Sequence, residues 1–262
     1  GAASHAAADD RTITTATTDP VFTATAGGNP ASPGDITVQA SGGSITVDGA
    51  GEAAITVNSN NDVTNAGTLT SADVDNSGGI NILDGFSGTI TNSGTISVTD
   101  DHTMTDPDSD GDLDGEFSDR TGRYGIQLGS GTYTGNITNT GTINVEGNNS
   151  YGILINGLLD GDGATTGNLN VAGQLAIVGD NSVGIAIDGG LTGGVTGDVL
   201  ARASMSVSGE GSQGLLVNAP IGGALRLNGT WRVSGFHDLG RPQNTDNLDA
   251  DDLLIGGALI IV

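Results

Sequence analysis

Several residue types that stabilise most domains are missing or scarce in this chain. It has no cysteine, so neither disulfide bonds nor thiolate metal sites are available. Only 3% of its 262 residues are aromatic, whereas a compact globular domain of this length usually has a richer aromatic core. Any core must therefore be built from Ile, Val, Leu and Ala. No apolar run reaches the roughly 18 residues that a membrane-spanning helix needs, so no direct membrane insertion is expected.

Positive charge is also scarce. The formal net charge is −24, and all seven basic residues are arginine. Nucleic-acid binding is excluded on this composition, because neutralising phosphates requires a basic patch. Anionic membrane surfaces are excluded as partners for the same reason. The acidic residues are mainly Asp, which suits turns and the binding of hard cations better than the surfaces of helices.

The residues that are abundant indicate many short strands. The chain has 46 Gly and is rich in Thr and Asn, with short apolar runs between turn residues. Self-similarity then decides the architecture: segments 134–159, 166–191 and 196–221 align at offsets of 32 and 30 residues. We count seven or eight units between about residue 36 and the end of the chain. Two sets of residues fall in the same positions of successive units: Ile143, Leu175 and Met205, and Ile153, Ile185 and Leu215.

Each unit contains three short strands separated by turns, at 137–139, 142–145 and 152–156 in the clearest case. Apolar residues alternate within them, so one face of each strand is buried. Strands this short cannot form independent hairpins, but stacked units can bury a continuous core. The sequence therefore predicts an all-β fold: a right-handed single-stranded parallel β-helix (solenoid) with three short strands per coil. The alternative is a sandwich or barrel of antiparallel hairpins, which would not require the same residue type at one place in every unit.

The pattern does not extend over the whole chain. Residues 1–35 lack it and are expected to form a flexible or poorly patterned N-terminal leader, with the β-helix covering 36–262. Loop insertions are expected at 99–123 and 236–252. They follow the equivalent residues Val98 and Val233, so both should project from one flank, about 20 Å apart. The apolar end of the chain has no polar cap, from which we expect truncation at the C-terminus.

One column of polar residues has two interpretations. Asn65, Asn92 and Asn139 occupy the position that Val171, Ala201 and Leu227 take in later units. Asn is common at turns because it tolerates left-handed backbone. Alternatively, the three amides stack from coil to coil as a hydrogen-bonded ladder that gives way to an apolar stack.

Repeats such as ITNSGTI (90–96) and NNSYGILI (148–155) resemble those of passenger domains of Gram-negative autotransporters, the type V secreted surface proteins. The resemblance covers most of residues 36–262 and lies in the residue pattern of the repeats. It implies a structural or adhesive region at the bacterial cell surface, with a protein or glycan ligand, exported through an outer-membrane barrel that would follow this segment. Filamentous haemagglutinin-like proteins and S-layer proteins have repeats of a similar residue pattern and remain alternatives.

The first insertion has the pattern of a calcium loop. It contains a D-x-D-x-D-G run, and such loops need oxygen ligands at alternating positions with a Gly where the chain turns. The first half fits an EF-hand loop, but Phe117 stands at position 12 and the Glu comes one residue early. A solvated acidic loop is the other interpretation. The candidate calcium ligands are Asp106, Asp108, Asp110, Asp112, Asp114 and Glu116.

No catalytic set is evident. Asn244-Thr245-Asp246 followed by Asp251-Asp252 resembles fragments of the polygalacturonase signature, but the Gly-His-Gly and Arg-Ile-Lys motifs of that family are missing. The three histidines are His5, His102 and His237, and no Gly-x-Ser-x-Gly elbow occurs. Outward strand positions are expected to form a smooth Thr, Asn and Ser surface. We therefore predict a protein that is not an enzyme; the alternative is a carbohydrate-active β-helix enzyme, either a polysaccharide lyase or a glycoside hydrolase.

Overall fold

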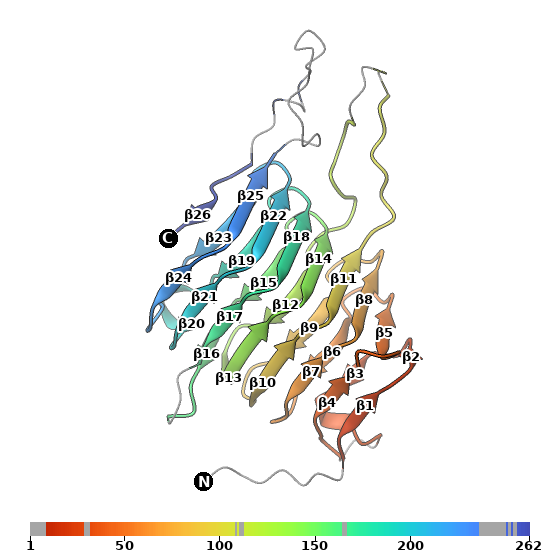
Figure 1. Ribbon diagram of the computed structural model, residues 1–262, viewed down its shortest axis with the longest axis vertical. Helices are drawn as coiled ribbons and strands as arrows, with labels where there is room; N and C mark the ends of the chain where they lie inside the picture. Colours follow the sequence, from red (N-terminus) through yellow and green to blue (C-terminus); the bar gives the residue numbers. More distant parts are fainter. Residues whose placement is uncertain are drawn as a thin grey trace.

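The computed structural model describes residues 9–28, 32–107, 109, 113–163, 167–235, 250, 253 and 256–262. The chain winds into stacked coils, each contributing one strand to each of three sheets (Figure 1). Apart from strands, the described residues contain two short 3-10 segments, η1 (Thr23–Thr25) and η2 (Gly190–Thr192). Within that part of the chain, no helix is long and apolar enough to cross a membrane.

The three sheets are called A, B and C in the order in which the chain visits them. Sheet A contains β1 (Arg11–Ile13), β4 (Ile36–Val38), β7 (Val63–Asn65), β10 (Ser87–Asn92), β13 (Thr132–Asn139), β17 (Leu169–Val171), β21 (Val199–Ala201) and β24 (Leu225–Leu227), with β16 (Leu158–Asp160) and β20 (Gly194–Val195) beside them. Sheet B contains β2 (Ala16–Thr17), β5 (Ser44–Val47), β8 (Thr68–Ala72), β11 (Thr95–Thr99), β14 (Thr142–Glu146), β18 (Gln174–Val178), β22 (Ser204–Ser208) and β25 (Thr230–Ser234). Sheet C contains β3 (Val21–Phe22), β6 (Ala53–Val57), β9 (Gly78–Ile82), β12 (Tyr124–Leu128), β15 (Tyr151–Ile155), β19 (Val183–Ile187), β23 (Gln213–Val217) and β26 (Ile260–Ile261).

The predicted fold class is confirmed. All pairings between the named strands are parallel, which excludes a sandwich or barrel of antiparallel hairpins for this part of the chain. The predicted columns are also confirmed. Two series of residues pair in register, as expected: Ile143, Leu175 and Met205 in sheet B, and Ile153, Ile185 and Leu215 in sheet C.

The solenoid begins one coil earlier than the sequence suggested. Strands β1, β2 and β3 pair with β4, β5 and β6 of the next coil, so the expected flexible leader is wrong for residues 11–22. The periodicity is weak there because each of these strands buries at most one apolar side chain, such as Ile13 or Val21. Backbone hydrogen bonds to the following coil hold these strands in place where little apolar surface is buried.

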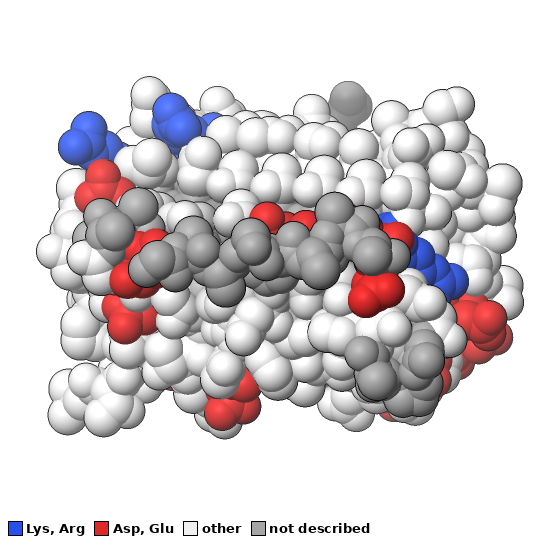
Figure 2. All heavy atoms as spheres, turned by 90° about the horizontal axis from the view of Figure 1, so that it is seen from below, with Lys and Arg blue, Asp and Glu red and all other residues white. Residues whose placement is uncertain are grey.

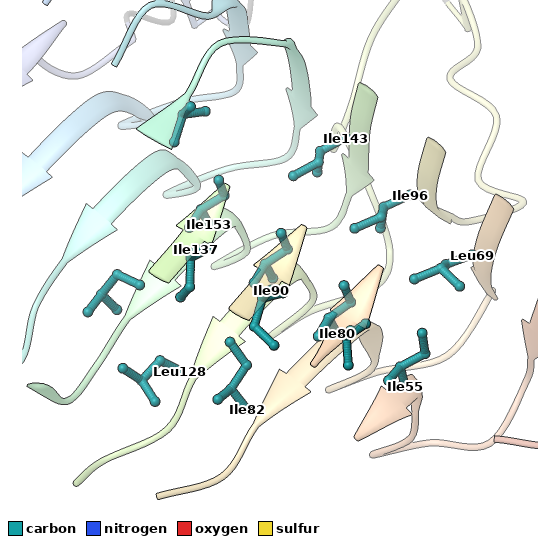
Figure 3. Packing of buried hydrophobic residues seen from close by; sticks show 14 of the residues in the cluster. Ile55, Leu69, Ile80, Ile82, Ile90, Ile96, Leu128, Ile137, Ile143 and Ile153 are labelled. Atoms are coloured by element: carbon teal, nitrogen blue, oxygen red, sulfur yellow. The ribbon is translucent and has the colours of Figure 1, made fainter. Parts of the chain in front are cut away.

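The core is a continuous stack of aliphatic side chains inside the three sheets. Ile90 of sheet A, Ile96 of sheet B and Ile80 of sheet C point into the common interior (Figure 3), and all three are fully buried. Burying each such side chain contributes roughly 1.5–3 kcal/mol. Because successive coils repeat these positions, the core has no break between the first coil and the last complete one.

The asparagine ladder predicted as one of two interpretations is present. The side-chain amide of Asn65 donates to Oδ1 of Asn92 over 2.7 Å, and that of Asn92 donates to Oδ1 of Asn139 over 2.6 Å. All three residues are fully buried and none has the positive φ of a left-handed turn. The turn interpretation is therefore wrong here. The next residue in the column is Val171, where the polar stack ends.

Left-handed turn residues do occur, at the corner between sheets B and C. Asn149 and Asn181 have φ of 50° and 53°, and Gly122 occupies the equivalent place with φ of 69°. Asn and Gly adopt this conformation at the lowest cost. This corner is therefore fixed locally in each coil, and it is the corner from which the first insertion leaves.

Candidate functional site

The first insertion is the most prominent departure from the regular coil. Strand β11 ends at Thr99 and β12 begins at Tyr124, and the chain between them rises beyond the strand ends (Figure 1). Its outgoing and returning segments are joined by an antiparallel bridge between Thr105 and Asp114. The backbone N–H of Asp114 donates to the carbonyl oxygen of Thr105 over 2.8 Å. The insertion is thus a narrow projection with two arms, and most of its acidic run falls in the sequence between the bridged residues.

Half of the predicted calcium ligands can be placed. Asp106 and Asp114 lie at the bridge and are partly buried, and Oδ1 of Asp106 is buried without a hydrogen-bond partner among the described residues. Glu116 is exposed on the returning arm, where its backbone carbonyl accepts a 2.7 Å hydrogen bond from Nε2 of His102. The calcium loop stays a prediction, because three of its six residues lie outside the described part of the chain: Asp108, Asp110 and Asp112.

A second acidic group lies at the base of the insertion, and no sequence pattern pointed to it. Asp73, Asp101 and Asp119 bring carboxylate oxygens within 4.8 Å of one another. Asp73 follows β8 in the preceding coil, whereas Asp101 and Asp119 belong to the two arms of the insertion. Only the stacking of coils brings them together, so no local motif could have revealed them.

This basal group already contains a cation. Nε of Arg120 lies 2.7 Å from Oδ1 of Asp73 and 3.4 Å from Oδ1 of Asp119. The hydrogen bond from Arg120 lowers the pKa of Asp73 below its usual 3.8, and the same bond raises the pKa of Arg120. Both side chains are partly exposed, so water screens the pair. The arrangement is an ion-pair network across the mouth of the insertion.

Beneath this network, Arg123 is fully buried. Its Nη1 donates to the carbonyl of Glu146 over 2.8 Å, and its Nη2 donates to the carbonyls of Ser71 and Thr99 over 3.0 and 2.8 Å. These carbonyls belong to strands β14, β8 and β11, so one guanidinium links three successive coils. Burial lowers the pKa of Arg123, and the nearby carboxylate of Asp100 opposes that effect. An arginine still remains protonated in such a site.

Arg123 interrupts a run of serines in its column, since Ser77 occupies the position in the preceding coil. In the following coils the position is taken by Ser150, Ser182 and Ser212, and each hydroxyl oxygen accepts the backbone N–H of the residue one coil before it, over 2.9–3.0 Å. The backbone N–H of Arg123 begins this ladder by donating to Ser150. Its side chain instead reaches the ends of the sheet B strands β8, β11 and β14.

Further hydrogen bonds attach the insertion to the next coil. The backbone N–H of Asp100 donates to Oε2 of Glu146 over 2.9 Å, and the side-chain amide of Asn148 donates to the carbonyl of Ser118 over 2.7 Å. The hydroxyl of Ser118 also donates to the carboxylate of Asp100, which joins the two arms. The base of the insertion is therefore bonded both to the coil before it and to the coil after it.

The flat faces of the sheets carry few charged side chains. Across strands β4 to β23, the described charged side chains are those of Glu146 and Asp160, and each lies at the end of its strand. Much of the surface seen from below is formed by uncharged residues (Figure 2). The candidate residues of the second insertion lie outside the described residues: His237, Asn244, Thr245, Asp246, Asp251 and Asp252.

The outer face of sheet C differs from the smooth polar surface that the sequence predicted. Leu154, Val183 and Ala186 form a buried apolar cluster there, with Tyr151 and Leu216 packed against it. Strict alternation assigns outward positions to Thr, Asn and Ser, which holds for most strands of sheets A and B, although Ala176, Val178 and Leu200 are apolar there. In sheet C the third strand of several coils is apolar on both faces, as strands in fully covered parallel sheets are.

The positions from which the two insertions leave are equivalent, as predicted. Val98 pairs with Val145, and the same column continues through Ile177 and Val207 to Val233. Val98 and Val233 therefore lie on the same flank of the solenoid, four coil steps apart, which corresponds to roughly 20 Å. The course of the second insertion itself lies outside the described residues.

No family model, no curated protein and no solved structure matches this chain.

If the acidic run of the insertion binds calcium, titration should reveal it. We expect binding heat at up to about millimolar calcium, because six carboxylates within eleven residues (106–116) repel one another until a divalent ion offsets the repulsion. Replacing Asp106 and Asp114 together by Asn should abolish that heat, whereas replacing Asp180, an acidic residue at the same corner two coils away, should not. An absence of binding heat in the unmodified protein would leave a solvated acidic loop as the correct interpretation.

Proposed function

We propose that this chain is a rigid, non-catalytic part of a secreted bacterial surface protein, of the kind that autotransporter passenger domains represent. In this proposal the solenoid is a spacer, and its first insertion is displayed to a protein or glycan ligand outside the cell. The observation that carries the proposal is an insertion anchored at its base to a solenoid whose core is continuous. The resemblance of the repeats to passenger domains supplies the cellular setting.

The continuous core supports the role of a spacer. Because the coils repeat one pattern of side chains, the stack forms a stiff rod in which each coil contacts its neighbours. Loops that project from such a scaffold can change without disturbing it, and they commonly carry the binding function. The acidic insertion is the longest projection among the described residues, and its arms are held by Arg120 and Arg123.

Electrostatics supports a binding role over catalysis. Acid–base cleavage of a glycoside needs two carboxylates about 5–9.5 Å apart facing a sugar. In the described strands β4 to β23, the carboxylates are those of Glu146 in sheet B and Asp160 in sheet A, at the ends of strands in different sheets. Two of the three carboxylates at the base of the insertion, those of Asp73 and Asp119, are instead paired with Arg120. With a net charge of −24, the protein attracts basic surfaces over long distances at low ionic strength. The proposal therefore favours a ligand with exposed basic groups.

Shortening the insertion tests this function. We expect a variant in which residues 104–115 are replaced by a short Gly-Ser link to keep its thermal midpoint within about 3 °C of the parent. In contrast, salt-sensitive binding of the labelled parent protein to an array of extracellular-matrix proteins and polysaccharides should be lost. A matched control places the same link at 190–192, an outlying segment at another corner where Leu191 is 96% exposed.

Two results would contradict the proposal. One is equal binding by the parent and the shortened variant, which would move the binding site away from the insertion. The other is release of reducing ends or unsaturated products from polygalacturonate or another polysaccharide by the purified protein, which would show that the chain is an enzyme.

A further inference from the structure

We propose that the base of the insertion is an arginine clasp, made of Arg120 with Asp73, Asp101 and Asp119, which fixes the orientation of the insertion. In this proposal, breaking the clasp loosens the two arms while the solenoid beneath stays folded. The inference concerns how the insertion is held and does not depend on what the insertion binds.

The geometry of the four residues carries the proposal. They come from three separate places in the chain: the turn after β8, the outgoing arm and the returning arm. Carboxylates within 4.8 Å of one another repel unless a cation lies among them. Arg120 supplies that cation, through contacts of 2.7 Å to Asp73 and 3.4 Å to Asp119. Without it, the charges of Asp73, Asp101 and Asp119 would drive the arms away from the preceding coil.

Arg123 explains why the solenoid should survive when the clasp opens. Its buried guanidinium joins the ends of β8, β11 and β14 through backbone carbonyls, independently of the clasp. The inward residues Val98 and Ile126 on either side of the insertion are also fully buried. The insertion between β11 and β12 is thus held at two levels: Arg123 bonds the strand ends inside the solenoid, and Arg120 pairs with carboxylates at the surface.

The charged groups around the clasp set its dependence on pH. The preceding coil contributes Asp73 and Asp75, the outgoing arm Asp100, Asp101 and His102, the returning arm Asp119, Arg120 and Arg123, and the following coil Glu146. The pKa of Asp73 is lowered, chiefly by its hydrogen bond from Arg120. A lowered carboxyl pKa stabilises the closed form above the usual value of 3.8, and this stabilisation is lost as the pH falls through the lower, closed-state value. The clasp should therefore stay closed at about pH 5 and open only below the usual Asp range.

Hydrogen exchange of the insertion tests the clasp in the full chain. In the Arg120→Ala variant, we expect amides of residues 100–122 to exchange about fivefold faster, which is the scale of a good surface ion pair. Amides of β8, β11 and β14 should keep their wild-type rates, and the thermal midpoint should not change measurably. In Arg120→Lys, the amides of the insertion should exchange at a rate between those of the wild type and of Arg120→Ala, because lysine keeps the charge but not the planar guanidinium. Arg202→Ala, which removes a surface arginine bonded to Asn170, is the control and should behave as wild type.

Salt separates an ionic clasp from simple packing. At about 1 M NaCl, where charges are screened within a few ångströms, the wild-type insertion should exchange as fast as that of Arg120→Ala. Three outcomes would overturn the proposal. The first is equal amide exchange in the wild type and Arg120→Ala at low salt, and the second is faster exchange in all coils of the variant. The third is that calcium alone slows amide exchange at the base of the insertion in Arg120→Ala. The last result would assign the basal carboxylates to a metal rather than to the arginine.

Discussion

Replacing Ile143 by Ala is expected to lower the free energy of unfolding by about 3–5 kcal/mol. Ile143 is fully buried in sheet B, in register with Ile96 in the preceding coil and Leu175 in the next. Its branched end also fills the space beside Gly125, where a Cβ would lie 2.3 Å from Cγ2 of Ile143. The surrounding strands are pinned by pairing on both sides, so they cannot collapse into the cavity that the substitution leaves.

The measurement is the urea midpoint of unfolding, followed by far-ultraviolet circular dichroism. Asn144→Ala is the matched control, because Asn144 is on the same strand but points outward and is partly exposed. Its substitution should change the free energy by at most about 0.5 kcal/mol. Equal losses for the two variants would mean that the inward column of sheet B does not carry the stability assigned to it.

Register was predictable from the sequence because a parallel solenoid places each residue directly over its equivalent in the next coil. Offsets of 32 and 30 residues between repeats therefore translate into strand pairs such as Ile153 with Ile185. The equivalence of Val98 and Val233 follows from the same rule. The asparagine ladder could be anticipated as one of two interpretations, since identical polar residues in an inward column satisfy one another's hydrogen bonds.

The features that could not be predicted from the sequence involve residues outside the regular alternation of apolar and polar positions. The first coil was missed because Ile13 and Val21 stand nearly alone among Thr and Ala. The clasp was missed because Asp73 belongs to the preceding coil and reaches Arg120 only through stacking. Arg123 left a usable signal: in an alignment of repeats it takes the place of Ser150, and a charged residue in an inward serine column indicates a buried contact.

The outer face of sheet C shows a different limit. Alternation assigns one polar and one apolar face to a strand, but Val183–Ile187 is buried along its whole length. The small side chain of Ala186 lies between Leu154 and Leu216 in the outward column. A continuous apolar run predicts burial on both faces, and the residues VGIAI of this strand form such a run.

The asparagine ladder provides the second large effect. Asn92→Ala should lower the free energy of unfolding by about 2–4 kcal/mol, because it leaves the buried amide of Asn65 and Oδ1 of Asn139 without their ladder partner. Asn65 already stands at the end of the ladder: Val38 precedes it in the column, and its own Oδ1 is buried without a partner among the described residues. Urea unfolding again provides the measurement.

Replacing the whole ladder distinguishes a hydrogen-bond effect from a packing effect. The column itself continues as Val171, Ala201 and Leu227, so apolar residues are compatible with its backbone. A triple variant with Val at positions 65, 92 and 139 removes donors and acceptors together, and removing both partners of buried hydrogen bonds can be nearly neutral. We therefore expect the triple variant to be more stable than Asn92→Ala, although it changes more residues. The contrary result is a triple variant that loses as much free energy of unfolding as the three single substitutions added together. Each Asn would then stabilise its own coil separately, and the loss in Asn92→Ala would come from a packing defect rather than from unsatisfied amides.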